Sequence, residues 1–341
     1  MTKKASTPAL RFKGFTYTWE QRKLSEFADK VTEKNVGLQY IETFTNSAEF
    51  GIISQRDFFD HDIAKMSSLG GYYIVRSEDF VYNPRISTSA PVGPINRNKL
   101  GRIGVMSPLY TVFRPHDIGT TYLEHFFKSK YWHSFMNFNG DSGARSDRFS
   151  IKDSVFFEMP IPIPHIEEQR KIGEYLTHLD RLITLHQRKY DKLTNMKKSM
   201  LEKMFPKNGA NVPEIRFKGF TDAWEQRKLG EAVQEVTRND ATSDAPIMMI
   251  TANNGFIEQS ERYAFNNAGE SLKKYILLEK GELAYNHGAS KLRPYGSCFT
   301  LTTSENARIP FVYHCFSADE QNSEFLSIEL NGADVENQLR R

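Results

Sequence analysis

The amino-acid sequence predicts an α+β protein in which two tandem domains are joined by a long helix of the coiled-coil type. Three observations support this prediction. One segment occurs twice, an apolar seam lies between the two copies, and short β-branched and aromatic runs are separated by glycine and proline. The expected boundaries are a first domain over residues 1–165, the long helix over 166–205, a linker over 206–215 and a second domain over 216–341.

The duplication is visible as a repeated opening segment. Residues 11–26 read RFKGFTYTWEQRKLSE and residues 216–231 read RFKGFTDAWEQRKLGE, so three of the sixteen aligned positions differ. The shift of 205 residues is much longer than the period of solenoid or propeller repeats, and each copy is therefore expected to be a domain. Between such landmarks the two copies diverge almost completely, which fits two similar frameworks with different recognition surfaces.

Within the first copy, we expect short strands over residues 71–75, 79–83 and 105–113, where β-branched and aromatic residues gather between turn-forming residues. The long helix follows, with apolar positions that alternate in steps of four and three, as in a coiled-coil seam. Only His186 and Lys197 interrupt this seam. Its apolar members, which we expect to form a subunit interface, are Ile172, Leu176, Leu179, Ile183, Tyr190, Leu193, Met200 and Met204.

The second copy ends at a position that answers residue 136 of the first, so we expect the second spacer helix to be missing. The seam of the first helix then lacks an internal partner. We expect it to pair with another copy of the chain or with a different subunit.

The distribution of charge is more informative than the net charge of +3. No acidic residue lies between Asp79 and Asp117, although this window contains Arg85, Arg97, Lys99, Arg102 and Arg114. The second copy repeats the pattern, because Lys291 and Arg293 lie in an acid-free stretch between Glu282 and Glu305. Contact with nucleic-acid phosphates and a solvated loop are the two interpretations, and the recurrence in both copies favours the first.

Asparagine and arginine side chains can read adenine and guanine edges in the major groove. Asn83 with Arg85, and Asn286 with Arg293, are candidates for such contacts. The neighbouring Tyr82 and Tyr285 are candidate contacts as well. The alternative is that the Tyr-Asn pairs pack at the ends of strands.

Two further arginines, Arg145 and Arg148, lie in a glycine-containing segment before the long helix. Glycine permits close approach of the backbone, and arginine clamps phosphate or carboxylate groups. The interpretations are DNA or domain anchoring and a buried pair with Asp147 or Asp141.

Several catalytic classes lack their sequence signals. The chain has no N-P-P-Y-like loop, no G-x-G-x-x-G turn, no G-x-x-x-x-G-K-[ST] phosphate loop and no clustered carboxylates suited to Mg²⁺. We therefore expect no catalytic centre, no metal site and no cofactor in this chain. No apolar run long enough for a membrane span or a signal peptide occurs, so we expect a cytoplasmic protein without a membrane partner.

The repeated opening, the segment GARSDR at 143–148 with MPIP at 159–162, and EQRKI at 168–172 leading into a long helix that ends KMF at 203–205 resemble type I restriction specificity subunits. The resemblance covers nearly the whole chain. It implies two target recognition domains that read the halves of a bipartite site in double-stranded DNA, with the helix as their spacer.

The same resemblance implies partner subunits that carry the chemistry. Modification subunits would methylate adenine with S-adenosylmethionine, and restriction subunits would use ATP and Mg²⁺ to translocate and cut DNA. Two alternatives remain at this point: a truncated, half-type specificity subunit that self-associates, and a coiled-coil scaffold without DNA binding.

Overall fold

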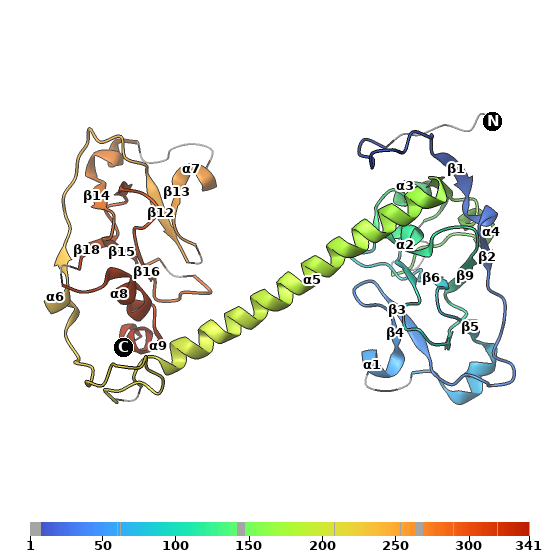
Figure 1. Ribbon diagram of the computed structural model, residues 1–341, viewed down its shortest axis with the longest axis horizontal. Helices are drawn as coiled ribbons and strands as arrows, with labels where there is room; N and C mark the ends of the chain where they lie inside the picture. The colour runs from blue at the N-terminus through green and yellow to red at the C-terminus, as the bar shows by residue number, and fades with distance from the viewer. Residues whose placement is uncertain are drawn as a thin grey trace. The chain divides into compact units, whose positions relative to one another are not determined.

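The computed structural model describes residues 8–59, 61, 63–141, 147–207, 209–252, 254–263, 269–288, 290–318 and 320–340. Its contacts divide the chain into unit 1, Met1–Lys189, and unit 2, Tyr190–Arg341. Helices and mainly short antiparallel strands make up both units, as Figure 1 shows, so the α+β class is confirmed.

Unit 1 is built on a four-stranded sheet in the order β2-β9-β6-β7, with the strand pairs β1-β10, β3-β4 and β5-β8 beside it. The strands are β1 (Glu20–Lys23), β2 (Ala28–Lys30), β3 (Phe44–Ser47), β4 (Gly51–Ser54), β5 (Tyr73–Val75), β6 (Phe80–Tyr82), β7 (Ile95–Arg97), β8 (Gly104–Met106), β9 (Thr111–Pro115) and β10 (Pro160–Ile163). The helices are η1 (Leu24–Glu26), α1 (Gln55–Phe59), η2 (Met66–Gly71), α2 (Thr120–Lys128), α3 (His133–Asn139), α4 (Asp153–Phe156) and the long α5 (Ile166–Lys203).

Unit 2 repeats this order, with the four-stranded sheet β11-β18-β15-β16 and the pairs β12-β13 and β14-β17. Its strands are β11 (Gln234–Glu235), β12 (Met248–Thr251), β13 (Gly255–Glu258), β14 (Ile276–Glu279), β15 (Leu283–Asn286), β16 (Ser297–Thr300), β17 (Asn306–Ile309) and β18 (His314–Ser317). Its helices are α6 (Leu229–Ala232), α7 (Gln259–Arg262), η3 (Gly269–Lys274), α8 (Ser323–Leu330) and α9 (Ala333–Leu339).

Aromatic side chains from both the sheet and the helices fill the core of unit 1. Phe80 of β6 stacks on Phe113 of β9 with ring centroids 5.5 Å apart, and Phe127 of α2 meets Phe113 edge-on at 6.0 Å. Burial of such rings is a major stabilising contribution, and it fixes α2 against the sheet. The core of unit 2 uses smaller side chains, such as Ala284 and Cys315.

One expected strand is interrupted. Residues 105–113 form the end of β8, a turn and the start of β9, rather than one strand. The hydroxyl of Ser107 accepts a hydrogen bond from the backbone N–H of Leu109, and its carbonyl accepts one from Tyr110, which closes the turn. Serine favours such local bonds to the backbone.

Helix α5 extends for 38 residues and ends at Lys203, two residues before the expected boundary. Phe205 lies outside the helix, and its ring packs against Trp224 and Phe325. Most of α5 is exposed along its length. No helix within the described residues is both long and apolar enough to span a membrane.

Candidate nucleic-acid interface

A Tyr-Asn pair at the end of β6 holds one loop of unit 1 in place. The hydroxyl of buried Tyr82 donates to the carbonyl of Val92 at 2.9 Å, and its ring stacks on Phe156. Asn83 donates to the carbonyl of Asn46 at 2.7 Å and accepts from the backbone N–H of Arg85 at 3.0 Å. These bonds fix both ends of residues 84–92, which we name loop 1.

The same arrangement occurs at the end of β15 in unit 2. The hydroxyl of Tyr285 donates to the carbonyl of Tyr295. Asn286 donates to the carbonyl of Ile250 at 3.4 Å and accepts from the backbone N–H of Gly288 at 2.9 Å. We name the enclosed residues 287–295 loop 2.

A glycine with positive φ completes each frame. Gly93 has φ +82°, and a Cβ there would lie 2.1 Å from the carbonyl oxygen of Asn83. Gly296 has φ +95°, with the Asn286 carbonyl 2.4 Å from the same point. Only glycine fits such a contact without displacing the backbone. The geometry therefore supports the packing interpretation of both Tyr-Asn pairs, and a direct contact of Tyr82 with DNA would require this ring to leave the core.

The loops held by these two frames have unlike sequences. Loop 1 reads PRISTSAPV, and loop 2 reads HGASKLRPY. Each contains basic residues that reach the surface, namely Arg85 in loop 1 and Lys291 in loop 2. Arg293 is more enclosed, because its guanidinium donates to the carbonyl of Asn331 at 2.9 Å.

Unit 1 brings Arg85 and Arg148 together, although 63 residues separate them in sequence. The two residues form an antiparallel backbone bridge, and the neighbouring Phe149 N–H donates to the Pro84 carbonyl at 2.7 Å. The Arg85 side chain is 73% exposed and lies 3.9 Å from Asp147 at its nearest approach. Two guanidinium groups on adjacent backbone segments suit an anionic ligand such as phosphate. Arg145 lies outside the described residues.

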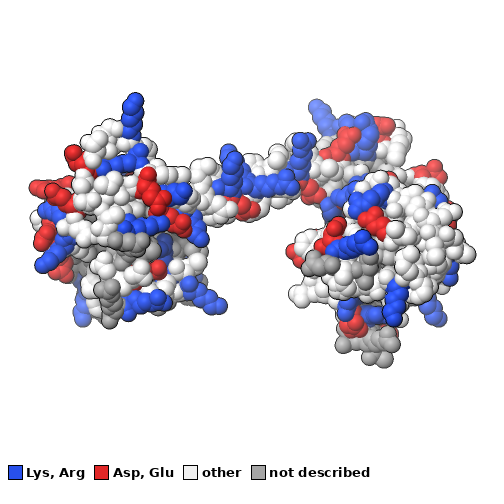
Figure 2. All heavy atoms as spheres, turned by 90° about the horizontal axis from the view of Figure 1, so that it is seen from below, with Lys and Arg blue, Asp and Glu red and all other residues white. Residues whose placement is uncertain are grey.

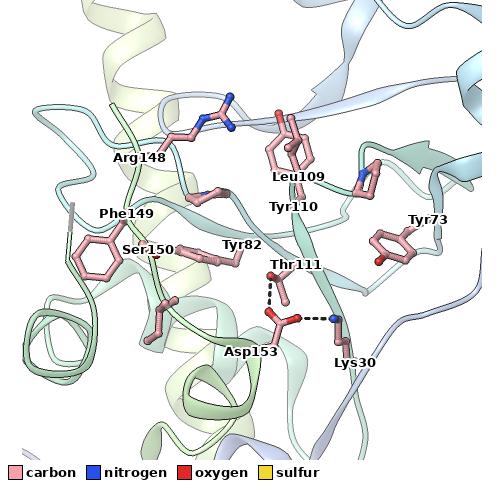
Figure 3. Close-up of a pocket in the computed structure, with 13 residues that line it drawn as sticks. Lys30, Tyr73, Tyr82, Leu109, Tyr110, Thr111, Arg148, Phe149, Ser150 and Asp153 are labelled. Carbon is pink, nitrogen blue, oxygen red and sulfur yellow. Dashed lines mark hydrogen bonds and ion pairs between the residues drawn. The ribbon is translucent and has the colours of Figure 1, made fainter. Parts of the chain in front are cut away.

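A pocket of about 470 Å³ is lined by Arg148 and by Pro84, the neighbour of Arg85. Figure 3 shows Arg148 at one end of the pocket, while Asp153 at the other end accepts hydrogen bonds from Thr111 and Lys30. The tyrosine rings of Tyr73, Tyr82 and Tyr110 line the walls. Such polar and aromatic walls suit contact with the sugar, phosphate or base of a nucleic acid.

All five cations in the acid-free window of unit 1 have a carboxylate within 4.0 Å, and the contact of Arg85 with Asp147, at 3.9 Å between exposed side chains, is the longest. Arg102 makes a two-pronged contact with Glu42 at 2.8 Å, and Arg114 makes one with Asp79 at 2.8 and 2.9 Å. Lys99 contacts Glu124 at 2.7 Å. The acids come from other segments of the chain, so the positive charge of the window is largely neutralised in space.

Arg97 is the most enclosed of these cations, with its side chain 11% exposed. Its guanidinium donates to Thr120 at 2.9 Å and Thr121 at 3.2 Å, and it contacts Glu124 at 2.5 Å. Burial alone would raise the pKa of Glu124. The Lys99 hydrogen bond and the nearby positive charges outweigh that effect and lower its pKa below the usual value. These contacts join β7 to α2, and we therefore interpret the cluster as an internal support that stabilises the fold of unit 1.

The seam of α5 is open over much of its length. Ile183 and Tyr190 are 67% and 66% exposed. Ile172, Leu176 and Met204 are partly buried, while Leu179, Leu193 and Met200 are exposed. Basic residues also gather on α5, because residues 181–198 contain six Lys or Arg and one acid; Figure 2 shows the charges on one face. An exposed apolar seam of this kind is typical of an interaction surface.

Sequence reasoning missed Lys30, Tyr73, Tyr110 and Asp153 around the pocket. No local pattern marks them, because strand pairing and α4 bring them together from four parts of unit 1. It also gave no role to the repeated opening, which docks on α5 through Arg11 and Glu168. Among the residues that the structure describes, no three His, Cys, Asp or Glu side chains are grouped to hold a metal.

Comparisons with known proteins identify a family for this chain. Residues 17–195 match the family model of the type I restriction modification DNA specificity domain. The chain is similar to the HsdS subunit from Thermoanaerobacter tengcongensis, with 16% identity, a TM-score of 0.45, and coverage of 99% of this chain and 83% of that one. It is also similar to the S subunit of a type I restriction-modification system from M. genitalium, with 14% identity, a TM-score of 0.50, and coverage of 98% and 82%. At identities of 16% and 14%, neither likeness shows more than the fold. A comparison with curated protein sequences gives no significant match.

Proposed function

Because this chain belongs to the type I restriction-modification DNA specificity family, we propose that it selects the DNA sequence on which a type I complex acts. In this proposal each unit is a target recognition domain that contacts half of a bipartite site in double-stranded DNA. The chain supplies recognition, and no catalytic family is indicated for it. In this proposal the protein works in the cytoplasm.

The observation that supports this proposal is the pair of matching frames with unlike loops. Tyr82 and Asn83 hold loop 1 as Tyr285 and Asn286 hold loop 2, yet the enclosed sequences differ. Identical frames present the loops in the same manner, and different side chains then select different bases. An asymmetric, two-part site follows from this arrangement.

The proposed division of labour separates positioning from selection. The cations that we assign to phosphates are exposed Arg85 and partly exposed Arg148 in unit 1, and exposed Lys291 in unit 2. The paired cations Arg97, Lys99 and Arg102 support the fold first, and Asn83, Asn286 and Arg293 orient the loops. Helix α5, at about 1.5 Å per residue, is roughly 57 Å long, or about one and a half turns of B-DNA, and in this proposal its length sets the gap between half-sites.

The exposed seam of α5 supports a role in assembly. We propose that modification subunits, which would bring S-adenosylmethionine, bind around this helix, and that restriction subunits with ATP and Mg²⁺ join the same complex. Exposed apolar side chains such as Ile183 and Tyr190 also favour the second candidate, self-association of two chains through α5.

The test is to express the chain with modification subunits in a host and map methylated adenines across the genome. A bipartite, asymmetric motif is expected. A palindromic motif would instead indicate two chains that pair through one unit each, and methylation without any motif would contradict a recognition role.

A second measurement tests the phosphate contacts. Replacing both Arg85 and Arg148 by glutamine should lower the affinity of the complex for its site about tenfold. It should also reduce the slope of log affinity against log salt concentration by the amount expected for roughly two phosphate contacts. The double variant Lys13→Gln and Lys218→Gln removes the same charge from exposed positions outside the loops, and it should bind as the wild type does. Equal effects in both variants would remove Arg85 and Arg148 from the interface.

A further inference from the structure

The pocket beside Arg148 in unit 1, which we name the tyrosine pocket, has polar groups at both ends. Figure 3 shows Arg148 at one end and Asp153 with Lys30 and Thr111 at the other. The volume of about 470 Å³ lies within the range of about 300–1,000 Å³ that is usual for small-molecule sites. The tyrosine pocket therefore has room for a ligand with two polar ends, but not for a DNA duplex.

Hydrogen bonds to two tyrosine hydroxyls hold the walls of the pocket in place. Tyr110 shares a hydrogen bond of 3.2 Å with the hydroxyl of Thr45, and buried Tyr82 donates to the carbonyl of Val92 at 2.9 Å. The side chains of Tyr110 and Tyr73 are partly exposed, so their rings can be reached by a ligand. Aromatic walls in fixed positions favour a planar ring such as a nucleobase.

Arg148 supplies the cationic end of the pocket. Its side chain is partly exposed, and among the described residues no carboxylate forms an ion pair with it, since neighbouring Asp147 approaches Arg85 instead. The backbone of Arg148 is fixed by its bridge to Arg85 and by the hydrogen bond from Phe149 to Pro84. A guanidinium group on a fixed backbone, with its donors free of a carboxylate, suits a phosphate.

An ion pair between Lys30 of β2 and Asp153 of α4 lies at the opposite end of the pocket. Asp153 also accepts a hydrogen bond from the hydroxyl of Thr111 at 3.2 Å. The pKa of Lys30 is raised, chiefly by its hydrogen bond to Asp153, so the amine stays charged. Both side chains remain accessible, with Lys30 36% and Asp153 44% exposed. A carboxylate has about four acceptor sites and an ammonium group has three donors, so each retains capacity for a ligand.

Two of these polar groups are particular to unit 1. Thr111 and His314 occupy the same position in β9 and β18, as Lys30 and Glu235 do in β2 and β11. The ring of His314 stacks on Tyr285, with ring centroids 6.3 Å apart. Lys30 and Thr111 therefore do not belong to the framework that both units share, which favours a role in ligand binding over a role in folding.

We propose that the tyrosine pocket binds one unpaired nucleotide, with its phosphate on Arg148 and its base along the tyrosine rings beside Lys30 and Asp153. Guanine fits this end best. Its Watson–Crick edge carries two adjacent N–H donors for the carboxylate of Asp153 and a carbonyl oxygen for the ammonium group of Lys30. The nucleotide comes either from DNA, as a base that has left the duplex, or from solution, and the first source rests on the proposed function.

The first test titrates the full chain with 2′-deoxyguanosine 5′-monophosphate (dGMP) and follows binding by isothermal titration calorimetry. Saturable binding is expected, with a dissociation constant of about 1 mM or lower. The deoxyinosine analogue (dIMP) lacks only the 2-amino group, one of the two donors assigned to Asp153. It should bind about tenfold more weakly.

Two variants locate the nucleotide in the pocket. Arg148→Gln and Asp153→Asn should each weaken dGMP binding about tenfold or more. In Asp153→Asn the difference between dGMP and dIMP should also become small, because the contact that distinguishes them is already lost. Thermal unfolding checks the fold of both variants. Arg148→Gln removes no ion pair with a described residue, so it keeps the test valid if Asp153→Asn is unstable.

The matched controls are Lys152→Gln and Asp29→Asn. They remove the same charges from exposed residues that adjoin Asp153 and Lys30 in sequence but do not line the pocket. Each should change dGMP binding less than about twofold, because exposed charges outside the site contribute little.

A second measurement distinguishes the two sources of the nucleotide. Three duplexes of otherwise identical sequence carry one bulged guanine, one bulged thymine or no bulge, and the bulged base is already unpaired. If the nucleotide comes from DNA, the full chain should bind the guanine bulge about threefold or more tightly than the thymine bulge, and Asp153→Asn should remove this preference. Binding of dGMP without a preference among the duplexes would assign the pocket to a free nucleotide.

Two results would overturn the proposal. One is the absence of saturable dGMP binding up to about 10 mM. The other is equal affinity of the wild-type chain and Arg148→Gln for dGMP, because the nucleotide would then bind elsewhere. The titration needs no DNA target, so its failure leaves the proposed recognition of DNA untouched. A chain that binds dGMP but directs methylation without any motif would fail the proposed function alone.

Discussion

Replacing Arg97 by methionine separates an internal support from a DNA contact. Methionine keeps much of the length and apolar volume of arginine and removes its charge and donors. The change breaks the hydrogen bonds to Thr120 and Thr121 and the contact with Glu124, which would stay largely buried with Lys99 and Lys128 as its remaining cations. The variant should therefore be markedly less stable.

The magnitude follows from these contacts. Breaking a buried ion pair by removing one partner costs about 3–5 kcal/mol, and the two remaining lysines reduce this to about 2–3 kcal/mol for unfolding of unit 1. For a unit of this size the melting temperature should fall by roughly 5–10 °C. Scanning calorimetry measures the change, and Trp132, which is buried in unit 1, reports the transition by fluorescence.

The control is Arg85→Met, which removes an exposed guanidinium from loop 1 and should leave the melting temperature within about 1 °C. Under the proposed function it should weaken DNA binding instead. If Arg97→Met has the same melting temperature as the wild-type chain while its DNA affinity falls, Arg97 is a phosphate contact and its role as an internal support is wrong.

Three other perturbations test the fold around the interface. The neighbouring cations lower the pKa of Glu124 in the folded state, so its carboxylate stabilises unit 1 above about pH 4.5 and loses this effect as the pH falls further. Glu124→Gln should therefore flatten the acid side of a plot of melting temperature against pH. An unchanged plot would contradict the pairing. Gly93→Ala should lower the free energy of unfolding, measured in urea, by about 3 kcal/mol or more, because its Cβ would overlap the Asn83 carbonyl. The control Gly101→Ala is also at positive φ but in open space, and it should lower this free energy by about 1 kcal/mol. Burial raises the pKa of Cys298 and of Cys315 to about 12. Both thiols should therefore react with a disulfide reagent at pH 8 at least about a hundredfold more slowly in the native chain than in urea. Fast labelling of the folded protein would refute their burial.

Local patterns predicted the elements whose determinants are local. The four-three spacing predicted α5 to within two residues, and the alternation of β-branched residues with turn formers placed β5 and β6. The turn at Ser107 was missed because the apolar residues on both sides resemble one strand. Its hydrogen bonds depend on a single hydroxyl and on backbone geometry.

The candidate site was harder to predict because it depends on contacts between distant segments. The sequence shows the acid-free window correctly, but it does not show which acids lie near it in space. Glu42 contacts Arg102 from 60 residues away, and Glu124 contacts Lys99 from 25 residues away. The bridge between Arg85 and Arg148 was equally invisible, since a backbone pairing of this kind leaves no spacing pattern. Tertiary pairing of charge therefore decides which basic residues remain free for a ligand.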